Sequence, residues 1–465
     1  MQTIPRFLER RALKVATGDS KSMPILATRP LRFRHAVAGV VLAALATACV
    51  DGSREPSASG DAARSSGGNS NRAATAASGG RAGETSTIDA GGAAQGSASA
   101  GGTTAVGDTA AIGGSGAVAG AGAGMRDIPS TQIVKEMKLG WNLGNTLDSQ
   151  TTETSWGNPK TTQAMIDTVK AGGFNTVRIP TTWQWHMGGA PDYAVDATFM
   201  NRVEEVTNYV LSNGMYAILN THHDSWVSLM PTADQAAISS RIAKLWAQIA
   251  NRFKNYDDHL IFETLNEPRT TDATQWTGGT AAARTILNAY NLAAVNAIRA
   301  TGGNNALRHI MIPTHAANAS TTCINALVIP NDDPRIIVSL HTYFPNNISM
   351  GGATTWGTSA EKTAMETELQ RIYNLLPAKG RAVVIGEWGT INQDNLAVRV
   401  DHAQTYAAFV TARGMCPIWW DNGATASGSD GFGLLDRKVS PPTWAFPTVV
   451  SALATGATEG AALSP

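Results

Sequence analysis

Short apolar runs alternate with stretches of helical periodicity along most of the chain, and this alternation restricts the possible folds more than any other feature. Each run is long enough for one buried strand. Strands that alternate with helices build a parallel sheet from βα units. Eight runs are present, the number found in a (β/α)8 TIM barrel, which is an α/β fold. The runs lie at residues 138–145, 175–180, 216–220, 260–267, 309–313, 335–340, 382–386 and 415–420. The expected helices between them lie at residues 161–170, 199–210, 238–253, 286–297, 361–376 and 396–412.

Composition divides the chain of 465 residues into unlike parts. Residues 50–124 are mostly Gly, Ala, Ser and Thr, with few large aliphatic side chains and no aromatic one. Such a segment cannot bury enough surface to offset its ordering entropy, so it is predicted to be a disordered linker. Residues 125–465 have the length of one (β/α)8 barrel and are predicted to form a single catalytic domain.

The first 49 residues are predicted to be an export signal. Basic residues precede an apolar run at 36–48, which is too short for a permanent transmembrane helix. A start at Met23 would give the signal a more usual length than a start at Met1. Ala-Thr-Ala before Cys49 suits ordinary cleavage and also resembles a bacterial lipoprotein signal with a lipidated Cys49. The chain is therefore expected to be secreted or anchored at the surface or outer membrane of a bacterium.

Charge and cysteine usage limit the possible partners. The formal net charge is zero and no basic stripe is present, so nucleic acid is not expected to bind. In an oxidising compartment Cys323 and Cys416 allow either a disulfide or two buried thiols. Nothing in the sequence requires more than a monomer.

Polar and aromatic side chains follow many of the predicted strands. In a barrel the carboxyl ends of the strands meet at one face, so these side chains are expected to line one cleft. Taken singly, each has an ordinary structural interpretation, such as a solvated glutamate, an arginine in a structural ion pair or a core tryptophan. The candidate cleft residues are Arg178, His222, His223, Asn266, Glu267, His341, Tyr343, Glu387 and Trp420.

Glu267 and Glu387 would face each other from the fourth and seventh strands. Glycoside hydrolysis uses such a pair, in which one carboxylic acid protonates the leaving oxygen and the other attacks the anomeric carbon or activates water. A separation of about 5 Å predicts a nucleophile and retention of configuration, whereas a wider gap predicts inversion. Arg178 and Tyr343 are suited to hold an ionised nucleophile. Glu267 must begin protonated, so it is expected in the drier or more negative setting.

Two further side chains are expected to contact the sugar. Asn266 can donate to the 2-hydroxyl, a contact that strengthens in the transition state. Trp420 offers a ring face to the sugar, and strand alternation places its neighbour Trp419 on the other side.

Adjacent histidines and an aspartate, His222-His223-Asp224, provide zinc-ligand chemistry. Neighbouring side chains on an extended segment point in opposite directions, so the two histidines are not expected to share one ion. The sequence has no His-Glu-x-x-His, no cysteine pair at metal spacing and no glycine-rich phosphate loop. A metal site is therefore not expected here.

From about Ile128 onward the sequence resembles glycoside hydrolase family 5, and bacterial endoglucanases in particular. Motifs typical of that family occur in order. The resemblance implies a (β/α)8 barrel, a retaining double displacement without metal or cofactor, Glu267 as acid/base and Glu387 as nucleophile. It also assigns the other seven candidate residues to the cleft. The motifs are residues 140–145 (GWNLGN), 178–180 (RIP), 221–223 (THH), 265–268 (LNEP), 341–343 (HTY), 386–389 (GEWG) and 419–423 (WWDNG).

The resulting prediction is an exported endo-β-1,4-glucanase that cuts internal bonds of cellulose or mixed-linkage β-glucan. A xyloglucanase or mannanase would use the same machinery. From other classes, the sequence also allows a non-catalytic surface carbohydrate-binding protein, or an anchored scaffold or adhesin whose linker is the functional part.

Overall fold

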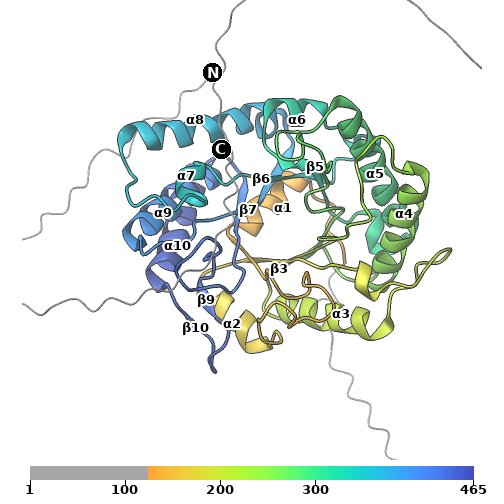
Figure 1. The fold of residues 1–465 in the computed structure, drawn as a ribbon, viewed down its shortest axis with the longest axis horizontal. Coiled ribbons are helices and arrows are strands. Elements are labelled where there is room, and N and C mark those ends of the chain that lie inside the picture. Colours follow the sequence, from red (N-terminus) through yellow and green to blue (C-terminus); the bar gives the residue numbers. More distant parts are fainter. Residues whose placement is uncertain (1–123, 465) are drawn as a thin grey trace, which may run out of the picture. The chain divides into compact units, whose positions relative to one another are not determined.

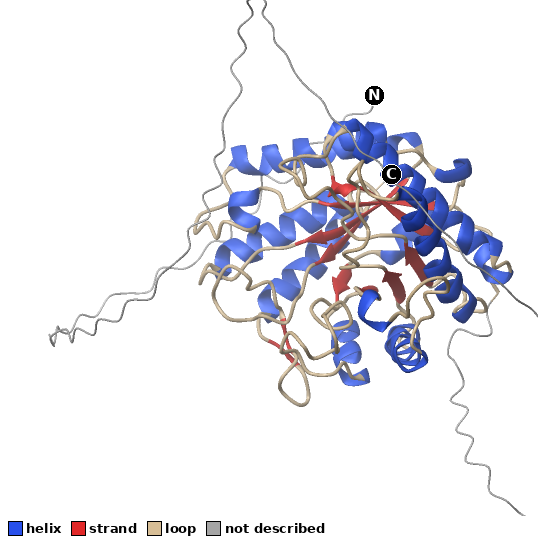
Figure 2. Ribbon diagram, turned by 45° about the vertical axis from the view of Figure 1, so that its right-hand side comes forward, coloured by secondary structure: helices blue, strands red, loops and turns tan. Residues whose placement is uncertain are grey.

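The computed structural model describes residues 124–464. Eight parallel strands form a closed barrel in chain order, β1 to β8, and the helices surround it (Figures 1 and 2). This confirms the predicted (β/α)8 barrel. The strands are β1 (Gly140–Asn142), β2 (Thr176–Ile179), β3 (Tyr216–Asn220), β4 (Leu260–Glu263), β5 (Ile310–Asn318), β6 (Ile336–His341), β7 (Ala382–Trp388) and β8 (Cys416–Trp419). The export signal with Cys49 lies outside the described residues, and so does the linker except for its last residue.

Each predicted helix is present, and side-chain caps fix where several begin. Asp196 accepts a hydrogen bond from the Phe199 amide, and Asp234 accepts one from Ala237, so both bind free amides of a first helical turn. Thr358 and Glu361 form a capping box at the start of α8. The barrel helices are α2 (Gln163–Ala171), α3 (Ala197–Leu211), α4 (Gln235–Arg252), α5 (Ala281–Ala300), α6 (Thr321–Ala326), α7 (Asn346–Ser349), α8 (Ser359–Leu375) and α9 (Leu396–Thr411).

The fourth and seventh strands end differently from the prediction. β4 ends at Glu263, because the carbonyl of Thr264 accepts hydrogen bonds from the side chains of Thr221 and Trp246 instead of a neighbouring strand. Glu267 therefore lies on the loop after β4 and not at the end of the strand itself. β7 continues to Trp388, so Glu387 lies within the strand.

The hydrophobic core has two layers. One layer lies between the strands and the surrounding helices and includes Val177, Leu219 and Phe262. The other fills the barrel interior toward the amino-terminal end of the strands. There, alternate residues of several strands, among them Ile218 and Ile261, point inward. α1 (Ser130–Met137) packs Ile133, Val134 and Met137 into this inner layer at the amino-terminal end of the strands. The apolar filling of that end leaves the carboxyl end for polar side chains.

Apart from short 3-10 helices, the elements of the described residues that were not predicted from the sequence are α1, α6, α7, the hairpin of β9 (Leu435–Asp436) with β10 (Thr443–Trp444), and α10 (Pro447–Ala461). α10 lies beside α9 on the outside of the barrel (Figure 1). Its close approach depends on glycine, because a Cβ at Gly456 would collide with the backbone of Gln404, and one at Gly460 with the carbonyl of Ala408.

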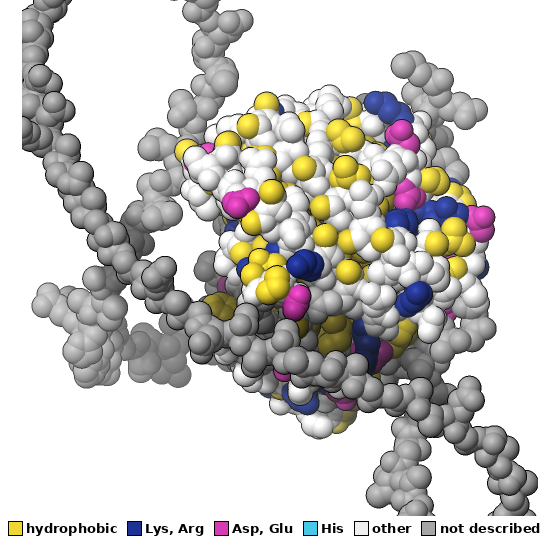
Figure 3. All heavy atoms as spheres, turned by 90° about the vertical axis from the view of Figure 1, so that its right-hand side faces the viewer, with side chains coloured by type: hydrophobic (Ala, Val, Ile, Leu, Met, Phe, Trp, Pro, Cys, Tyr) yellow, Lys and Arg dark blue, Asp and Glu magenta, His cyan; other side chains and the backbone are white. Residues whose placement is uncertain are grey.

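One face of the described part carries charges of both signs, and the two cysteines of that part are buried. Charged side chains of both signs are interspersed among apolar and neutral ones on the face that carries α4 and α5 (Figure 3). Cys323 and Cys416 are buried free thiols, which confirms the second of the two alternatives. None of the helices in residues 124–464 has the length and apolar character needed to cross a membrane.

Candidate active site

Arg178 is the centre of the polar network inside the barrel. It lies on β2, is fully buried, and donates in three directions. Its Nε lies 2.7 Å from Oε2 of Glu263, its Nη1 lies 2.8 Å from Oε1 of Glu387, and its Nη2 lies 2.7 Å from Oδ1 of Asn266. Burial alone would lower the pKa of Arg178, but the charges of Glu263 and Glu387 raise it, so the guanidinium stays charged. The guanidinium of Arg178 thus binds side chains that come from β4, from the loop after β4 and from β7.

Glu387 accepts hydrogen bonds on both carboxylate oxygens. Arg178 donates to Oε1, and the hydroxyl of Tyr343 donates to Oε2 over 3.0 Å. Burial raises the pKa of Tyr343 well above its usual value, and the charge of Glu387 adds to the rise, so this hydroxyl keeps its proton. Because neither donor gives up its hydrogen, this geometry favours the ionised form of Glu387.

Glu267 contacts a different partner. Its Oε1 lies 2.8 Å from Nδ1 of His341, and the same nitrogen lies 3.5 Å from Oε2 of Glu387. A carboxylate oxygen of Glu267 and one of Glu387 lie within 4.8 Å of each other. Gly386 allows this arrangement, because a Cβ there would lie 3.0 Å from Nε2 of His341. The separation matches the roughly 5–5.5 Å of retaining glycosidases and leaves no room for the intervening water of an inverting enzyme.

The two carboxyl groups and His341 titrate together. Burial lowers the pKa of His341, but the charge of Glu387 and the hydrogen bond to Glu267 raise it above its usual value overall. Burial raises the pKa of Glu387, and His341 and Arg178 oppose that rise without cancelling it. Burial also raises the pKa of Glu267, yet the hydrogen bond and charge of His341 bring it below its usual value. The proton available to Glu267 is therefore shared with His341.

The drier setting expected for Glu267 belongs instead to Glu387. The side chain of Glu267 is 18% exposed, whereas that of Glu387 is 8% exposed. The difference arises because Glu267 lies on a loop and Glu387 within a strand. The resting protonation of Glu267 thus depends on His341 more than on dryness.

His222, Asn266 and Trp420 form one side of the cleft. Nε2 of His222 lies 3.3 Å from Nδ2 of Asn266, and its ring is parallel to that of Trp420 with centroids 5.9 Å apart. Burial lowers the pKa of His222 well below its usual value, so the ring is neutral. Trp419 is fully buried in the outer core, whereas Trp420 is only partly buried. His223 is exposed, with Trp156 against its ring at 5.6 Å. The structure thus brings all nine predicted residues to one end of the barrel.

The relation between the two histidines differs from the prediction. β3 ends at Asn220 and the chain bends, so strand alternation no longer applies and the rings of His222 and His223 lie 4.4 Å apart. A ring nitrogen of each histidine lies within 4.8 Å of a carboxylate oxygen of Asp148. Asp224 instead accepts a hydrogen bond from the amide of Trp183.

Groups of metal-ligand type therefore occur twice at this end, and several of their ligand atoms already have hydrogen-bond partners. His222 contacts Asn220 and Asn266, and Asp148 accepts two backbone amides. In the second group, Glu267, His341 and Glu387, the positive charge of Arg178 at 2.8 Å opposes a cation.

Sequence reasoning missed several supporting residues. Glu263 is fully buried and accepts from Arg178, Asn220 and Ser339. The sequence feature that could have identified Glu263 is a carboxylate within an apolar strand, because a buried carboxylate must be paired. Asn142 accepts from Arg178 and donates to the carbonyl of Gly386, which ties the first strand to the seventh.

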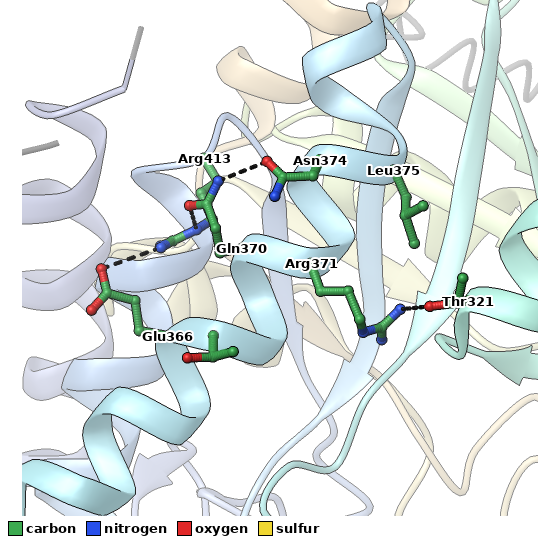
Figure 4. A pocket seen from close by; sticks show the side chains of 8 residues that line it. Thr321, Glu366, Gln370, Arg371, Asn374, Leu375 and Arg413 are labelled. Carbon is green, nitrogen blue, oxygen red and sulfur yellow. Dashed lines mark hydrogen bonds and ion pairs between the residues drawn. The ribbon is translucent and has the colours of Figure 1, made fainter. Parts of the chain in front are cut away.

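A separate hollow of about 480 Å³ lies between α6, α8 and α9 (Figure 4). Its charged side chains contact one another or neighbouring polar groups. Arg413 contacts Glu366 and Gln370, and Arg371 contacts Thr321. None of the predicted site residues lines this hollow.

Comparison with known proteins gives consistent matches. The family model "Cellulase (glycosyl hydrolase family 5)" matches residues 142–426. Endoglucanase B of Clostridium cellulovorans is 55% identical over 343 residues, which is 72% of this chain and 77% of that protein. The solved structure of a broad-specificity endoglucanase from Clostridium acetobutylicum is 51% identical with a TM-score of 0.69, covering 70% of this chain and 100% of that one. A broad-specificity endoglucanase from Ruminococcus champanellensis with bound cellotriose is 43% identical with a TM-score of 0.68, covering 71% of this chain and 99% of that one.

Proposed function

The chain belongs to glycosyl hydrolase family 5, and we propose that Glu387 and Glu267 perform its reaction as nucleophile and acid/base. The enzyme is a retaining endo-β-1,4-glucanase whose substrate is a β-glucan polysaccharide such as cellulose or mixed-linkage β-glucan. The separation of the two carboxylates, within 4.8 Å, supports the retaining mechanism. The assignment of roles rests on their partners, since Arg178 and Tyr343 donate to Glu387 whereas His341 contacts Glu267.

In the first step, Glu387 attacks the anomeric carbon and the bond to the leaving oxygen breaks. Arg178 and Tyr343 support this role, since both donate hydrogen bonds to the carboxylate of Glu387, which favours its ionised form against the effect of burial. Glu267 gives its proton to the leaving oxygen, and His341 supplies the shared proton through its 2.8 Å contact. In the second step Glu267 takes a proton from water, which attacks the same carbon and releases Glu387.

The cleft residues are proposed to bind the sugar that is cleaved. Arg178 donates to Oδ1 of Asn266 and so orients its amide group, and the amide hydrogen that does not face His222 is available to a sugar hydroxyl. Trp420 provides a flat face beside His222. Neither contact distinguishes cellulose from branched xyloglucan, so the choice between these substrates depends on the surrounding loops.

Domain organisation and export are proposed on the sequence alone. An insoluble glucan cannot enter a cell, so an enzyme that cuts it must act outside. We propose that residues 1–49 direct export, that residues 50–124 form a linker, and that residues 125–465 act as a monomeric catalytic domain. Lipidation of Cys49 would add a membrane anchor.

The test is turnover by residues 125–465 on carboxymethyl cellulose, mixed-linkage β-glucan, xyloglucan, glucomannan and xylan. We expect the fastest cutting on the first two and loss of activity in Glu387→Ala. A maximum on xyloglucan or glucomannan would keep the mechanism and change the substrate. A folded domain without turnover on any of them would contradict the proposal and favour a binding protein.

A further inference from the structure

Arg399, on α9, is a buried cation without a counter-ion in the described part of the chain. Its side chain is fully buried, yet Nη1 and Nη2 have no hydrogen-bond partner within residues 124–464. Nε contacts Oγ1 of Thr390 over 3.4 Å, which is a long hydrogen bond. Arg178 and Arg308 are equally buried, but each of their guanidinium nitrogens donates to a carboxylate, an amide oxygen or a backbone carbonyl.

The guanidinium of Arg399 keeps its proton despite this burial. Burial lowers its pKa from the ordinary 12.5 to about 10, which leaves the group charged at neutral pH. Asp421 is the acid whose charge acts on it, but both oxygens of that carboxylate already accept hydrogen bonds, one from Arg437 and the other from Trp141. A buried charge is costly unless it is paired and hydrogen-bonded. A counter-ion from solution would remove this cost.

The starts of two helices add to the positive potential around Arg399. It is the fourth residue of α9, where the positive end of the helix dipole disfavours a cation. Its guanidinium carbon lies 4.3 Å from the centre of the ring of Phe446, the residue just before α10. Neither helix has an acidic residue in its first turn, and within the described structure neither Asn395 nor Phe446 caps its helix with a side chain. Helix starts of this kind bind anions through their free amides.

We propose that a small monovalent anion, for which chloride is the natural probe, binds Nη1 and Nη2 of Arg399 between the starts of α9 and α10. The two helices lie side by side on the outside of the barrel (Figure 1). The site is separate from the catalytic cleft, and it does not depend on the proposed roles of Glu267 and Glu387.

The surroundings of Arg399 favour a monatomic anion. Phe446 covers one face of the guanidinium, so the N–H groups in its plane are the ones that remain for a ligand. Thr390 is fully buried and contacts Nε through its oxygen, so its hydroxyl hydrogen is a further donor. Phosphate or sulfate would bring four oxygens to a buried place with few donors, whereas chloride is satisfied by these few.

The anion would connect both helices to the strand that carries Glu387. Thr390 follows the end of β7 by two residues, and the ring of Trp388 in β7 stacks on Tyr406 of α9 with centroids 4.0 Å apart. Arg399 and Thr390 are not among the proposed sugar contacts. A ligand that binds the folded chain and not the unfolded chain stabilises the fold by mass action. The anion is therefore expected to raise stability and to leave turnover unchanged.

The first experiment measures the melting temperature of the full chain while sodium chloride replaces sodium gluconate at constant ionic strength and pH. We expect the wild-type value to rise by about 2 °C for each tenfold increase in chloride above its Kd. Arg399→Met removes the donors and keeps an unbranched side chain, so its melting temperature is expected to be lower and independent of chloride. If wild type and Arg399→Met depended on chloride equally, the proposal would be overturned.

Arg413 provides the matched control. It lies just after the end of α9 and its side chain is only 4% exposed, but its nitrogens donate to Gln370, to Glu366 and to a backbone carbonyl. We expect Arg413→Met to lower the melting temperature and to retain the chloride dependence of the wild type. Loss of that dependence in both variants would show a general effect of removing positive charge and would contradict a site at Arg399.

Wild-type crystals soaked in sodium bromide locate the ion without relying on a variant that folds. We expect an anomalous bromide peak in contact with Nη1 and Nη2 of Arg399. A water molecule in that place, without an anomalous peak, would contradict the proposal. A bromide peak combined with a melting temperature that does not respond to chloride would identify an adventitious ion only, and the proposal would fail.

Turnover separates this site from the catalytic cleft. Well below the melting temperature, we expect kcat/KM on soluble β-glucan to be the same in chloride and in gluconate. A chloride effect on kcat/KM without one on the melting temperature would place the anion in the cleft and overturn its assignment to Arg399. Failure of the catalytic roles of Glu267 and Glu387 would leave the melting and diffraction results unchanged, so the two proposals can be told apart.

Discussion

The acid/base role of Glu267 can be tested by the leaving group alone. A leaving group that departs without a proton needs little acid help. We expect Glu267→Gln to lower kcat/KM on β-glucan by about 100-fold or more and on β-cellobiosyl fluoride far less. Glu387→Gln is the control, because loss of the nucleophile should abolish both. Equal losses for Glu267→Gln on both substrates would contradict the assignment.

Proton sharing between Glu267 and His341 predicts a pH dependence. The pKa of His341 is raised above its usual value of about 6.5, so the shared proton stays bound at neutral pH and is lost as pH rises further. We expect the alkaline limb of kcat/KM on β-glucan to lie above pH 6.5 and to be absent for the fluoride's first step. The raised pKa of His341 also stabilises the folded state. This contribution to stability is fully present below the unfolded pKa of about 6.5 and is lost as pH rises through the higher pKa of the folded state. A limb well below pH 6.5 would contradict the sharing.

At the scale of single residues, the sequence predicted which side chains lie close together but not which partners each one contacts. Glu387 and Arg178 were identifiable because each is a charged residue next to a predicted apolar strand run. Glu263, which sets the position of Arg178, was read only as part of an apolar strand. The partner of His341 could not be predicted, since the loop after β4 carries Glu267 beyond the strand.

At the scale of elements, periodicity predicted the eight barrel strands and the longer barrel helices, but it missed the short helices α6 and α7 and also α1 and α10, the first and last helices of the described residues. α10 is rich in Ala and Gly and shows a weak apolar stripe, so its pattern resembles that of the linker. β5 also extends further than expected, through Ala316 and Ala317 at positive φ, because alanine gives no signal for such a conformation.

Close packing of α9 and α10 gives a prediction that opposes helix propensity. Alanine favours a helix over glycine by about 1 kcal/mol, yet a Cβ at Gly456 would collide with the carbonyl of Gln404. We expect Gly456→Ala to destabilise the domain by about 1–3 kcal/mol, as overpacking does. Thr455→Ala is the control, because Thr455 is exposed on the same helix and should be neutral or slightly stabilising. The measurement is thermal unfolding of both variants; a higher melting temperature for Gly456→Ala would contradict the contact.

At the scale of the whole molecule, the boundary between linker and domain is a physical claim about where burial begins. Gly124 is exposed with no atom near its Cβ position, whereas Ile133, Val134 and Met137 of α1 are buried in the inner core. A chain beginning at residue 125 should therefore match the full chain in melting temperature and in kcat/KM on soluble β-glucan. A chain beginning at residue 138 should be markedly less stable, because each buried apolar side chain contributes about 1.5–3 kcal/mol. If the chain from residue 125 failed to fold, the segment before it would be part of the domain and the linker hypothesis would be wrong. If the chain from residue 138 were equally stable, α1 would not close the amino-terminal end of the barrel as the packing indicates.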